Sequence, residues 1–277
     1  MSKRVAKLAF DKISASGQKK GSMIVMHGLF GSKTNFRSLA KRPEMSEERD
    51  VYLLDLRNHG HSEHKSTNSI EDISRDVINF LDEQKIDKTV LLGHSMGGKA
   101  AIEAAFRLQD RAEGLIIGDI GPFDYTKITS CNNTSILELL SSLDMTKFSK
   151  SQDIRKTIMD KLDGNKSLVD FLMTNVVTGE SGEFKWRVNL PVLSSDYNTF
   201  SSYIPKEGDS YNGPTVVLYG TKSEYMKPEN FPVFKKWFPN LNINRDFKAI
   251  VGGHWIHFAD PEAFLKHISD FLKQLPK

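Results

Sequence analysis

Short apolar runs alternate with amphipathic stretches through most of this chain. Continuous apolar runs bounded by turn residues are typical of strands that are buried on both faces of a sheet. The stretches between them carry apolar residues three and four positions apart, which predicts helices, and one such stretch begins at Ser69 with a capping-box pattern. This repeated order of strand and helix predicts an α/β fold with a mostly parallel central sheet flanked by helices. The predicted strands are residues 5–10, 21–26, 50–55, 90–92, 114–119, 215–220 and 247–251, and the predicted helices include 35–40, 99–108, 231–238 and 261–275.

Residues 123–203 interrupt this alternation. Only helical periodicities occur there, for example at Ile136 and Leu140. We therefore predict a core formed by residues 1–122 and 204–277, with residues 123–203 inserted between two strands as a helical lid. A lid in that place would shape a substrate pocket and exclude water from it.

The composition narrows the possible functions. The chain has 277 residues, 39% hydrophobic and 26% charged, as expected of a globular protein with a sizeable core. A net charge of +3, without a basic stripe interleaved with aromatics, disfavours nucleic-acid binding. Cys131 is the single cysteine, which excludes an internal disulfide, favours a reducing compartment and disfavours a zinc or thiol redox site. No apolar run approaches the ~18 residues of a membrane span, so we expect no integral membrane segment.

The strongest chemical signal is a G-x-S-x-G motif centred on Ser95. It follows a predicted strand and precedes a predicted helix, which is the context that a nucleophile elbow requires. Gly93 and Gly97 lack Cβ atoms, so the strand and the helix can approach closely and leave Ser95 on a strained, exposed turn. The alternative interpretation is a glycine-rich turn in which the serine has no chemical role.

A second turn predicts an oxyanion hole. His27-Gly28-Leu29-Phe30-Gly31 follows an early predicted strand, where glycines let backbone N–H groups point at a developing negative charge. We assign the two donors as the N–H groups of Leu29 and Met96, the latter being the residue after the serine. The alternative is a simple tight turn.

A general base is expected after the last strand, and His254 lies there, preceded by two glycines that let a loop carry its ring toward Ser95. The acid that should orient it has two candidates. The usual place follows the strand after the lid, where this chain has Ser223 and, one residue later, Glu224. Asp119 ends the strand after the elbow unit, on the edge of the sheet where ligands bind, and we favour it. Ser223 would then support Asp119 or His254 by a hydrogen bond.

The loop after residue 55 carries three histidines, at positions 59, 61 and 64. Their spacing on a loop without a suitably placed carboxylate disfavours a metal site. We predict instead that Asp55, Arg57 and His59 tie this loop to its neighbours.

These residues together resemble one subgroup of α/β-hydrolases, which contains YbfF-type bacterial esterases, mitochondrial abhydrolase-domain proteins and yeast ethanol acetyltransferases. The resemblance implies an α/β-hydrolase fold, a Ser95–Asp119–His254 triad and, at Ser223, a serine that the subgroup carries near its acid. It also implies a mitochondrial location, with a cytoplasmic alternative because only residues 1–4 precede the predicted first strand and no clear transit peptide is visible. The motifs that carry it are His27–Ser32, Asp55–Gly60, Gly93–Gly98, Asp119–Ile120 and Gly253–His257.

The predicted function is a serine hydrolase that cleaves small carboxylic esters or thioesters through an acyl-enzyme on Ser95. It needs a small-molecule substrate and no metal or organic cofactor. One alternative is an alcohol O-acetyltransferase that passes an acetyl group from acetyl-CoA to ethanol with the same triad. Another is a non-catalytic binding protein on a hydrolase scaffold. The pattern makes no prediction of acyl-chain length or oligomeric state.

Overall fold

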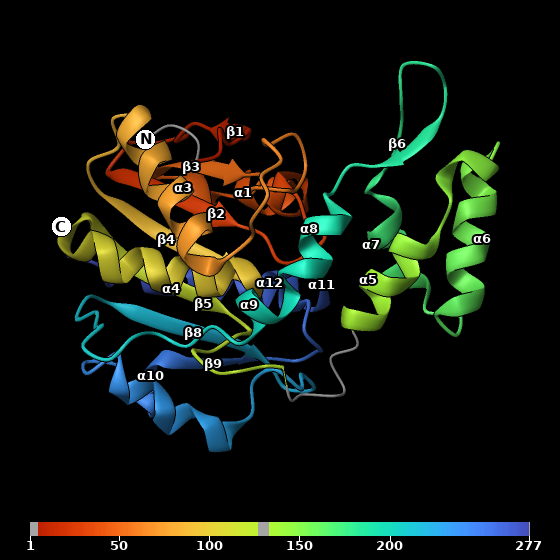
Figure 1. Ribbon diagram of the computed structural model, residues 1–277. Helices are drawn as coiled ribbons and strands as arrows, with labels where there is room; N and C mark the ends of the chain where they lie inside the picture. The colour runs from red at the N-terminus through yellow and green to blue at the C-terminus, as the bar shows by residue number, and fades with distance from the viewer. Residues whose placement is uncertain (1–4, 127–132, 277) are drawn as a thin grey trace.

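Seven strands form the central sheet (Figure 1) of the computed structural model, which describes residues 5–126 and 133–276. Only the first strand runs antiparallel to its neighbour, and the remaining pairs in this sheet are parallel. The predicted mostly parallel sheet is therefore confirmed. In spatial order the strands are β1 (Phe10–Ile13), β3 (Arg49–Leu54), β2 (Gly21–Met26), β4 (Thr89–His94), β5 (Ala112–Gly118), β8 (Thr215–Gly220) and β9 (Phe247–Ile250).

The inner strands are apolar throughout because helices cover both faces of the sheet. Along β2, Met23 and Val25 belong to one hydrophobic cluster, while Ile24 and Met26 belong to another on the opposite face. Successive side chains of a strand point to opposite faces, so a run of this kind is buried twice. The covering helices are α3 (Ile70–Glu83) and α4 (Met96–Leu108) on one face, and α1 (Arg37–Ala40), α2 (Pro43–Ser46) and α12 (Pro261–Leu272) on the other.

Several predicted boundaries agree with the structure. The strands at 21–26 and 215–220 coincide with β2 and β8, and α3 begins after Ser69, whose Oγ accepts a hydrogen bond from the Asp72 N–H at 3.1 Å. The predicted helix at 231–238 is instead a 3₁₀ helix over Pro228–Lys236 that contains Pro232, which has no N–H to donate. The other short elements are η1 (Lys33–Phe36), η2 (Gln109–Arg111), α10 (Ile243–Asp246) and α11 (Ile256–Ala259).

The predicted first strand at 5–10 is wrong, because β1 begins only at Phe10. Its alternating pattern is nevertheless real, since Ala6 and Leu8 are buried. The carbonyls of Lys7 and Ala9 accept from the N–H groups of Glu63 and Asp55, but the N–H groups of the segment donate to side chains and not to a neighbouring strand. The Ala6 N–H donates to the Asp76 carboxylate at 2.7 Å, and other N–H groups donate to Glu63 and Ser62.

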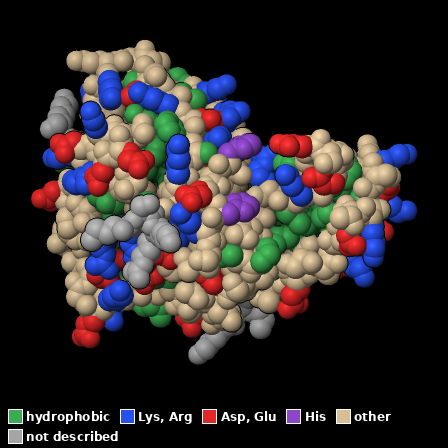
Figure 2. Space-filling view, turned by 45° about the horizontal axis from the view of Figure 1, so that its top comes forward, with side chains coloured by type: hydrophobic (Ala, Val, Ile, Leu, Met, Phe, Trp, Pro, Cys, Tyr) green, Lys and Arg blue, Asp and Glu red, His purple; other side chains and the backbone are tan. Residues whose placement is uncertain are grey.

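The chain between β5 and β8 forms a separate lobe beside the core (Figure 1). Figure 2 shows hydrophobic side chains gathered along this lobe, with histidines near its junction with the core. The expectation that it is helical throughout is wrong, because two short antiparallel strands form a hairpin there. β-Branched and aromatic residues on each side of a turn at Gly179 and Gly182 favour this hairpin. The elements are α5 (Asn133–Ser142), η3 (Met145–Lys147), α6 (Ser151–Lys161), α7 (Lys166–Met173), β6 (Val176–Thr178), β7 (Phe184–Trp186), α8 (Leu190–Ser195) and α9 (Tyr197–Ser201).

A buried lysine of α4 holds both ends of this insertion. Lys99 Nζ donates to the carbonyl oxygen of Phe123 at 2.8 Å, where the chain leaves the core. The same ammonium donates to the carbonyls of Ser201 at 2.6 Å and Tyr203 at 3.1 Å, where the chain returns. Cys131 lies outside the described residues. None of the described helices has the length and apolar composition needed to cross a membrane.

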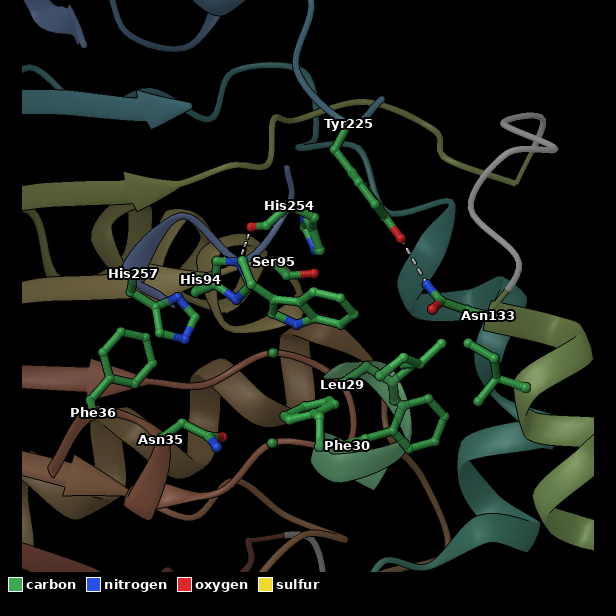
Figure 3. Close-up of a pocket in the computed structure, with 16 residues that line it drawn as sticks. Leu29, Phe30, Asn35, Phe36, His94, Ser95, Asn133, Tyr225, His254 and His257 are labelled. Atoms are coloured by element: carbon green, nitrogen blue, oxygen red, sulfur yellow. Dashed lines mark hydrogen bonds between the residues drawn. The ribbon is translucent and has the colours of Figure 1, made fainter. Parts of the chain in front are cut away.

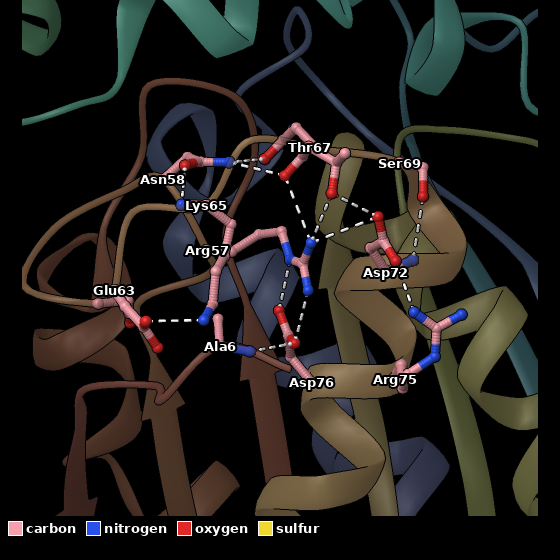
Figure 4. A network of polar contacts seen from close by, with 12 residues as sticks. Ala6, Arg57, Asn58, Glu63, Lys65, Thr67, Ser69, Asp72, Arg75 and Asp76 are labelled. Atoms are coloured by element: carbon pink, nitrogen blue, oxygen red, sulfur yellow. Dashed lines mark hydrogen bonds and ion pairs between the residues drawn. The ribbon is translucent and has the colours of Figure 1, made fainter. Parts of the chain in front are cut away.

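A buried ion pair organises the loop that follows β3 (Figure 4). Arg57 is 1% exposed and donates to both carboxylate oxygens of Asp76 on α3, at 2.6 and 2.7 Å. Asn58 continues the network, because its carbonyl oxygen accepts from the Asn189 N–H at 2.9 Å. Asn189 precedes α8, so the loop is tied to the core on one side and to the insertion on the other.

Asp76→Asn should lower the free energy of unfolding by about 3 kcal/mol, because it removes the charge that pairs with two nitrogens of the buried Arg57 guanidinium and leaves that group the longer ion pair with Asp72 at 3.4 Å. Urea unfolding measures this loss. The matched control is Arg75→Ala, which removes an exposed ion pair with Asp72 on the same helix and should change stability by less than about 0.5 kcal/mol. Equal effects of the two substitutions would contradict the assigned role of the buried pair.

Candidate active site

Ser95 occupies the turn between β4 and α4 in a strained conformation. Its φ of 55° and ψ of −122° are uncommon for a residue with a side chain. The turn is possible because two glycines let backbone segments meet. A Cβ on Gly93 would lie 2.1 Å from the Gly97 carbonyl oxygen, and one on Gly97 would lie 2.5 Å from the His27 carbonyl oxygen. The elbow therefore presents the hydroxyl at the carboxyl end of the sheet.

The loop after β2 lies directly against this elbow. A Cβ on Gly28 would be 3.1 Å from Ser95 Cβ. The Phe30 N–H is already used, because it donates to His59 Nε2 at 3.3 Å. No described residue accepts a hydrogen bond from the Leu29 N–H, and Met96, as the first residue of α4, has no acceptor within its helix. The two N–H groups predicted as oxyanion donors are thus both available beside Ser95.

His254 is hydrogen-bonded to Asp119 and not to Glu224. The Nδ1–H of His254 donates to Asp119 Oδ2 at 2.7 Å. Asp119 is fully buried at the end of β5, and its Oδ1 accepts from the Gly220 N–H at 2.8 Å. Ser223 Oγ also donates to Asp119 Oδ2. Glu224 is exposed and pairs with Lys227 at 2.8 Å. The structure therefore joins the predicted base to the acid at the strand end, with Ser223 as a second donor to it.

Ser95 and His254 face one cavity of about 230 Å³ (Figure 3). No hydrogen bond joins Ser95 Oγ to the His254 ring in this conformation of the described residues, so the hydroxyl must turn to reach it. Such contacts are often loose before substrate binds. The inserted lobe and the core together supply an apolar wall, and polar side chains lie at the other end. The apolar wall consists of Leu29, Phe30, Ile136, Leu168, Phe171 and Trp255, and the polar end of Asn35, His94 and His257.

Four further histidines are buried around the site and are neutral at neutral pH. Burial lowers the pKa of His27 and His94, and it lowers the pKa of His59 and His257 to about 3. The hydrogen bonds of His27 suit a neutral ring, since its Nδ1–H donates to the Gly28 carbonyl and its Nε2 accepts from the Leu56 N–H. His94 Nε2–H donates to the His254 carbonyl oxygen at 2.8 Å and so supports the loop that carries this residue.

The loop after β3 has the structural role predicted for it. Asp55 accepts from the Lys33 N–H at 2.7 Å and from the His61 N–H at 2.9 Å, which joins two loops of the site. His59 Nδ1–H donates to the Arg57 carbonyl, and His64 Nε2 bonds to the Arg187 carbonyl on the inserted lobe. The rings of His59 and His64 therefore have separate partners, and the described residues contain no group of side chains placed to hold a metal ion.

Sequence reasoning missed three residues that shape the site. Tyr225 stacks on the His254 ring, Asn133 donates a hydrogen bond to Tyr225, and Trp255 packs against Phe171 of α7. Each of these contacts joins segments that are far apart in the chain. Trp255 is, however, next to His254 in the sequence. A Trp next to the expected base was a visible signal, whereas no local pattern marks Tyr225 or Asn133.

Known proteins resemble this chain over almost its whole length. A family model described as alpha/beta hydrolase fold matches residues 21–136. The sn-1-specific diacylglycerol lipase ABHD11 of Mus musculus is 33% identical over 254 residues, which cover 91% of this chain and 80% of that relative. Esterase YbfF of Escherichia coli is 29% identical and covers 94% of this chain and 96% of its own length. A solved structure of an esterase from a marine microorganism has a TM-score of 0.87 and 29% identity, covering 96% of this chain and 99% of its own.

The buried histidines predict a loss of stability in acid. The pKa of His257 is about 3 in the folded chain and near 6.5 when unfolded, so the unfolded state binds more protons between these values. Stability therefore falls as the pH falls from 6.5 towards 3. His257→Phe keeps a ring against Phe36, 4.4 Å away in the native stack, but removes the titration. We would measure the free energy of unfolding by urea from pH 7 to pH 4.5. Its change with pH should be smaller for the variant than for the wild type, by up to about 1.4 kcal/mol per pH unit. Parallel curves would contradict a neutral, buried His257.

Proposed function

The chain belongs to the α/β-hydrolase family, within the group around ABHD11 and YbfF, and from this premise we propose that it is a serine esterase acting through an acyl-enzyme on Ser95. The observation that carries the proposal is the 2.7 Å hydrogen bond from His254, which lines the same cavity as Ser95, to the fully buried Asp119. An orienting acid, a base and a strained serine at one sheet edge are the parts that acyl transfer needs.

In the proposed reaction, Ser95 Oγ attacks the ester carbonyl while His254 Nε2 takes its proton. Asp119 keeps the other ring proton on Nδ1 and stabilises the imidazolium that forms. The carbonyl oxygen becomes negative in the tetrahedral intermediate and accepts from the N–H groups of Leu29 and Met96. His254 then returns its proton to the departing alcohol or thiol, which leaves the acyl group on Ser95.

A water molecule completes the proposed cycle. His254 removes a proton from it, the hydroxyl adds to the acyl carbonyl, and the free acid leaves as Ser95 recovers its proton. Ser223 and the Gly220 N–H assist throughout, because their hydrogen bonds stabilise the Asp119 carboxylate.

The cavity supports esters with apolar groups as the substrate class. Apart from Asn133, the side chains that the inserted lobe contributes to its lining are apolar, and its volume of about 230 Å³ suits a small ester or one part of a larger one. We extend the proposal to thioesters, since the same steps apply to them. Alcohol acetyltransfer would use the same acyl-enzyme and differ only in the second acceptor. A mitochondrial location stays a proposal that rests on the family resemblance.

Ser95→Ala should lower kcat by about 10⁶-fold, because it removes the nucleophile, and should abolish labelling by a fluorophosphonate probe. Hydrolysis of a short-chain p-nitrophenyl ester and mass spectrometry of the adduct measure these effects. The control is Ser181→Ala, at an exposed serine of the inserted lobe, which should keep wild-type rates. Turnover by folded Ser95→Ala would overturn the proposal.

The acyl acceptor is tested by adding ethanol to the wild-type reaction. The main product should remain the free acid, whereas an ethyl ester as the main product would favour the transferase alternative.

Asp119→Asn should lower kcat by about 10⁴-fold, because an amide cannot hold the required tautomer of His254 or stabilise its positive charge. Steady-state kinetics with the same ester measure the loss. Glu224→Gln makes the matching change at the exposed carboxylate and should leave kcat within about twofold of wild type. A large loss in Glu224→Gln with a near wild-type kcat in Asp119→Asn would show that Glu224 is the acid that orients His254.

A further inference from the structure

Tyr225 lies face to face with the imidazole of His254. The two ring centroids are 3.9 Å apart and the ring planes are inclined by only 18°. The other described rings near His254 meet it less directly, since His94 is 4.7 Å away at 40° and Trp255 is 6.4 Å away at 51°. Asp119 holds His254 only at Nδ1, so a single hydrogen bond leaves the ring free to rock about that contact. The stacked phenol removes this freedom.

The backbone of Tyr225 is tied to the acid. Its N–H donates to Ser223 Oγ at 3.2 Å, and that hydroxyl donates to Asp119. Its carbonyl oxygen accepts from Tyr125 Oη at 3.0 Å, and the same hydroxyl accepts from the Gly121 N–H at 2.8 Å. Contacts therefore run in a closed circuit from the acid through Ser223 and Tyr225 to the base. These contacts give the phenol ring a defined position relative to Asp119 and to the His254 ring.

The phenol oxygen reaches the inserted lobe. Asn133 Nδ2 donates to Tyr225 Oη at 2.9 Å, and Asn133 is the first residue of α5 (Figure 3). One turn further along this helix, Ile136 lines the cavity that contains Ser95. The helix that covers the substrate space is thereby hydrogen-bonded to the side chain that packs on the base. Another contact of the lobe, from Phe171 to Trp255, ends on the sequence neighbour of His254 and not on the His254 ring.

We propose that Tyr225 is a positioning residue through which α5 of the inserted lobe holds the imidazole of His254 in its reactive orientation. This inference rests on the proposed function, because it assigns His254 the role of base. In this role the phenol exchanges no proton and acts on the reaction through its stacking on the imidazole. Its contribution is to keep Nε2 directed at the Ser95 hydroxyl, and Asn133 keeps the phenol in place. Through the Tyr225 side chain, a molecule that occupies the cavity under α5 is then linked to the orientation of the His254 ring.

Three substitutions separate the two halves of this link. Tyr225→Leu removes the stacked ring, Tyr225→Phe keeps the ring but removes the hydrogen bond to α5, and Asn133→Ala removes the same hydrogen bond from the other side. The readouts are kcat and KM for a p-nitrophenyl ester, the rate of fluorophosphonate labelling of Ser95, and the thermal midpoint. Asn198→Ala, at an exposed asparagine of α9, is the matched control in the inserted lobe.

We expect Tyr225→Leu to lower kcat and the labelling rate by about 10- to 100-fold with KM within about twofold, since misorientation affects the reacting geometry more than binding. Tyr225→Phe should recover most of this loss and retain a deficit of about threefold. Asn133→Ala should match Tyr225→Phe, and the double variant should be no slower than either single one, because both break the same contact. Asn198→Ala should behave as wild type.

The two levels of inference fail differently. Wild-type protein that neither turns over esters nor reacts with the probe would overturn the proposed function and this inference together. Normal labelling of wild type with an equally fast Tyr225→Leu would overturn the inference alone. A loss in Tyr225→Leu that follows a lowered thermal midpoint and is not recovered in Tyr225→Phe would also overturn it, because the role would then be structural. If the losses of Tyr225→Phe and Asn133→Ala add up in the double variant, the two side chains act independently, and α5 does not hold His254 through Tyr225.

Discussion

The structure depends on a close approach of backbone at the end of β4. Gly93 and Gly97 leave no room for a side chain, and this contact forces the turn that presents Ser95. Gly97 also lies against the carbonyl oxygens of Met26 and His27, so the elbow and the loop after β2 are held together by this close contact as well as by the pairing of β2 with β4. The loop that carries Leu29 thereby lies against the turn that carries Ser95 and Met96. This steric constraint thus contributes to the geometry of both the serine and the proposed oxyanion hole.

The ends of two neighbouring strands, β5 and β8, divide the task of holding the base. Asp119 at the end of β5 supplies the carboxylate, while the β8 end supplies the Gly220 N–H and the Ser223 hydroxyl that bond to it. Since parallel strands end at the same edge of the sheet, a carboxylate on either strand can reach His254. The acid is therefore defined by its position at this edge rather than by its place in the chain order.

Most of the sheet and the principal site residues could be predicted because their signals are local. Strands buried on both faces produce continuous apolar runs, and the chemistry follows where such runs end. The first strand was predicted too early because Ala6 and Leu8 alternate as a strand does, although their N–H partners lie on side chains such as Asp76. The hairpin of the inserted lobe was missed because its strands are too short to set a period. Tyr225 and Asn133 meet across 92 residues of chain, and no pattern near either one records that contact.

The hydrogen bonds of Lys99 affect where the sequence of the inserted lobe is free to vary. One ammonium group binds carbonyls at the exit and at the return of the inserted lobe, and it does so from the helix that begins next to Ser95. Backbone carbonyls are the same for every residue type, so the hydrogen bonds themselves set no condition on the side chains at either end, although the ammonium also lies over the rings of Tyr125 and Tyr203. Substitutions within the lobe that leave these carbonyls in place can therefore change the wall of the cavity without altering the attachment of the lobe to the helix that follows Ser95.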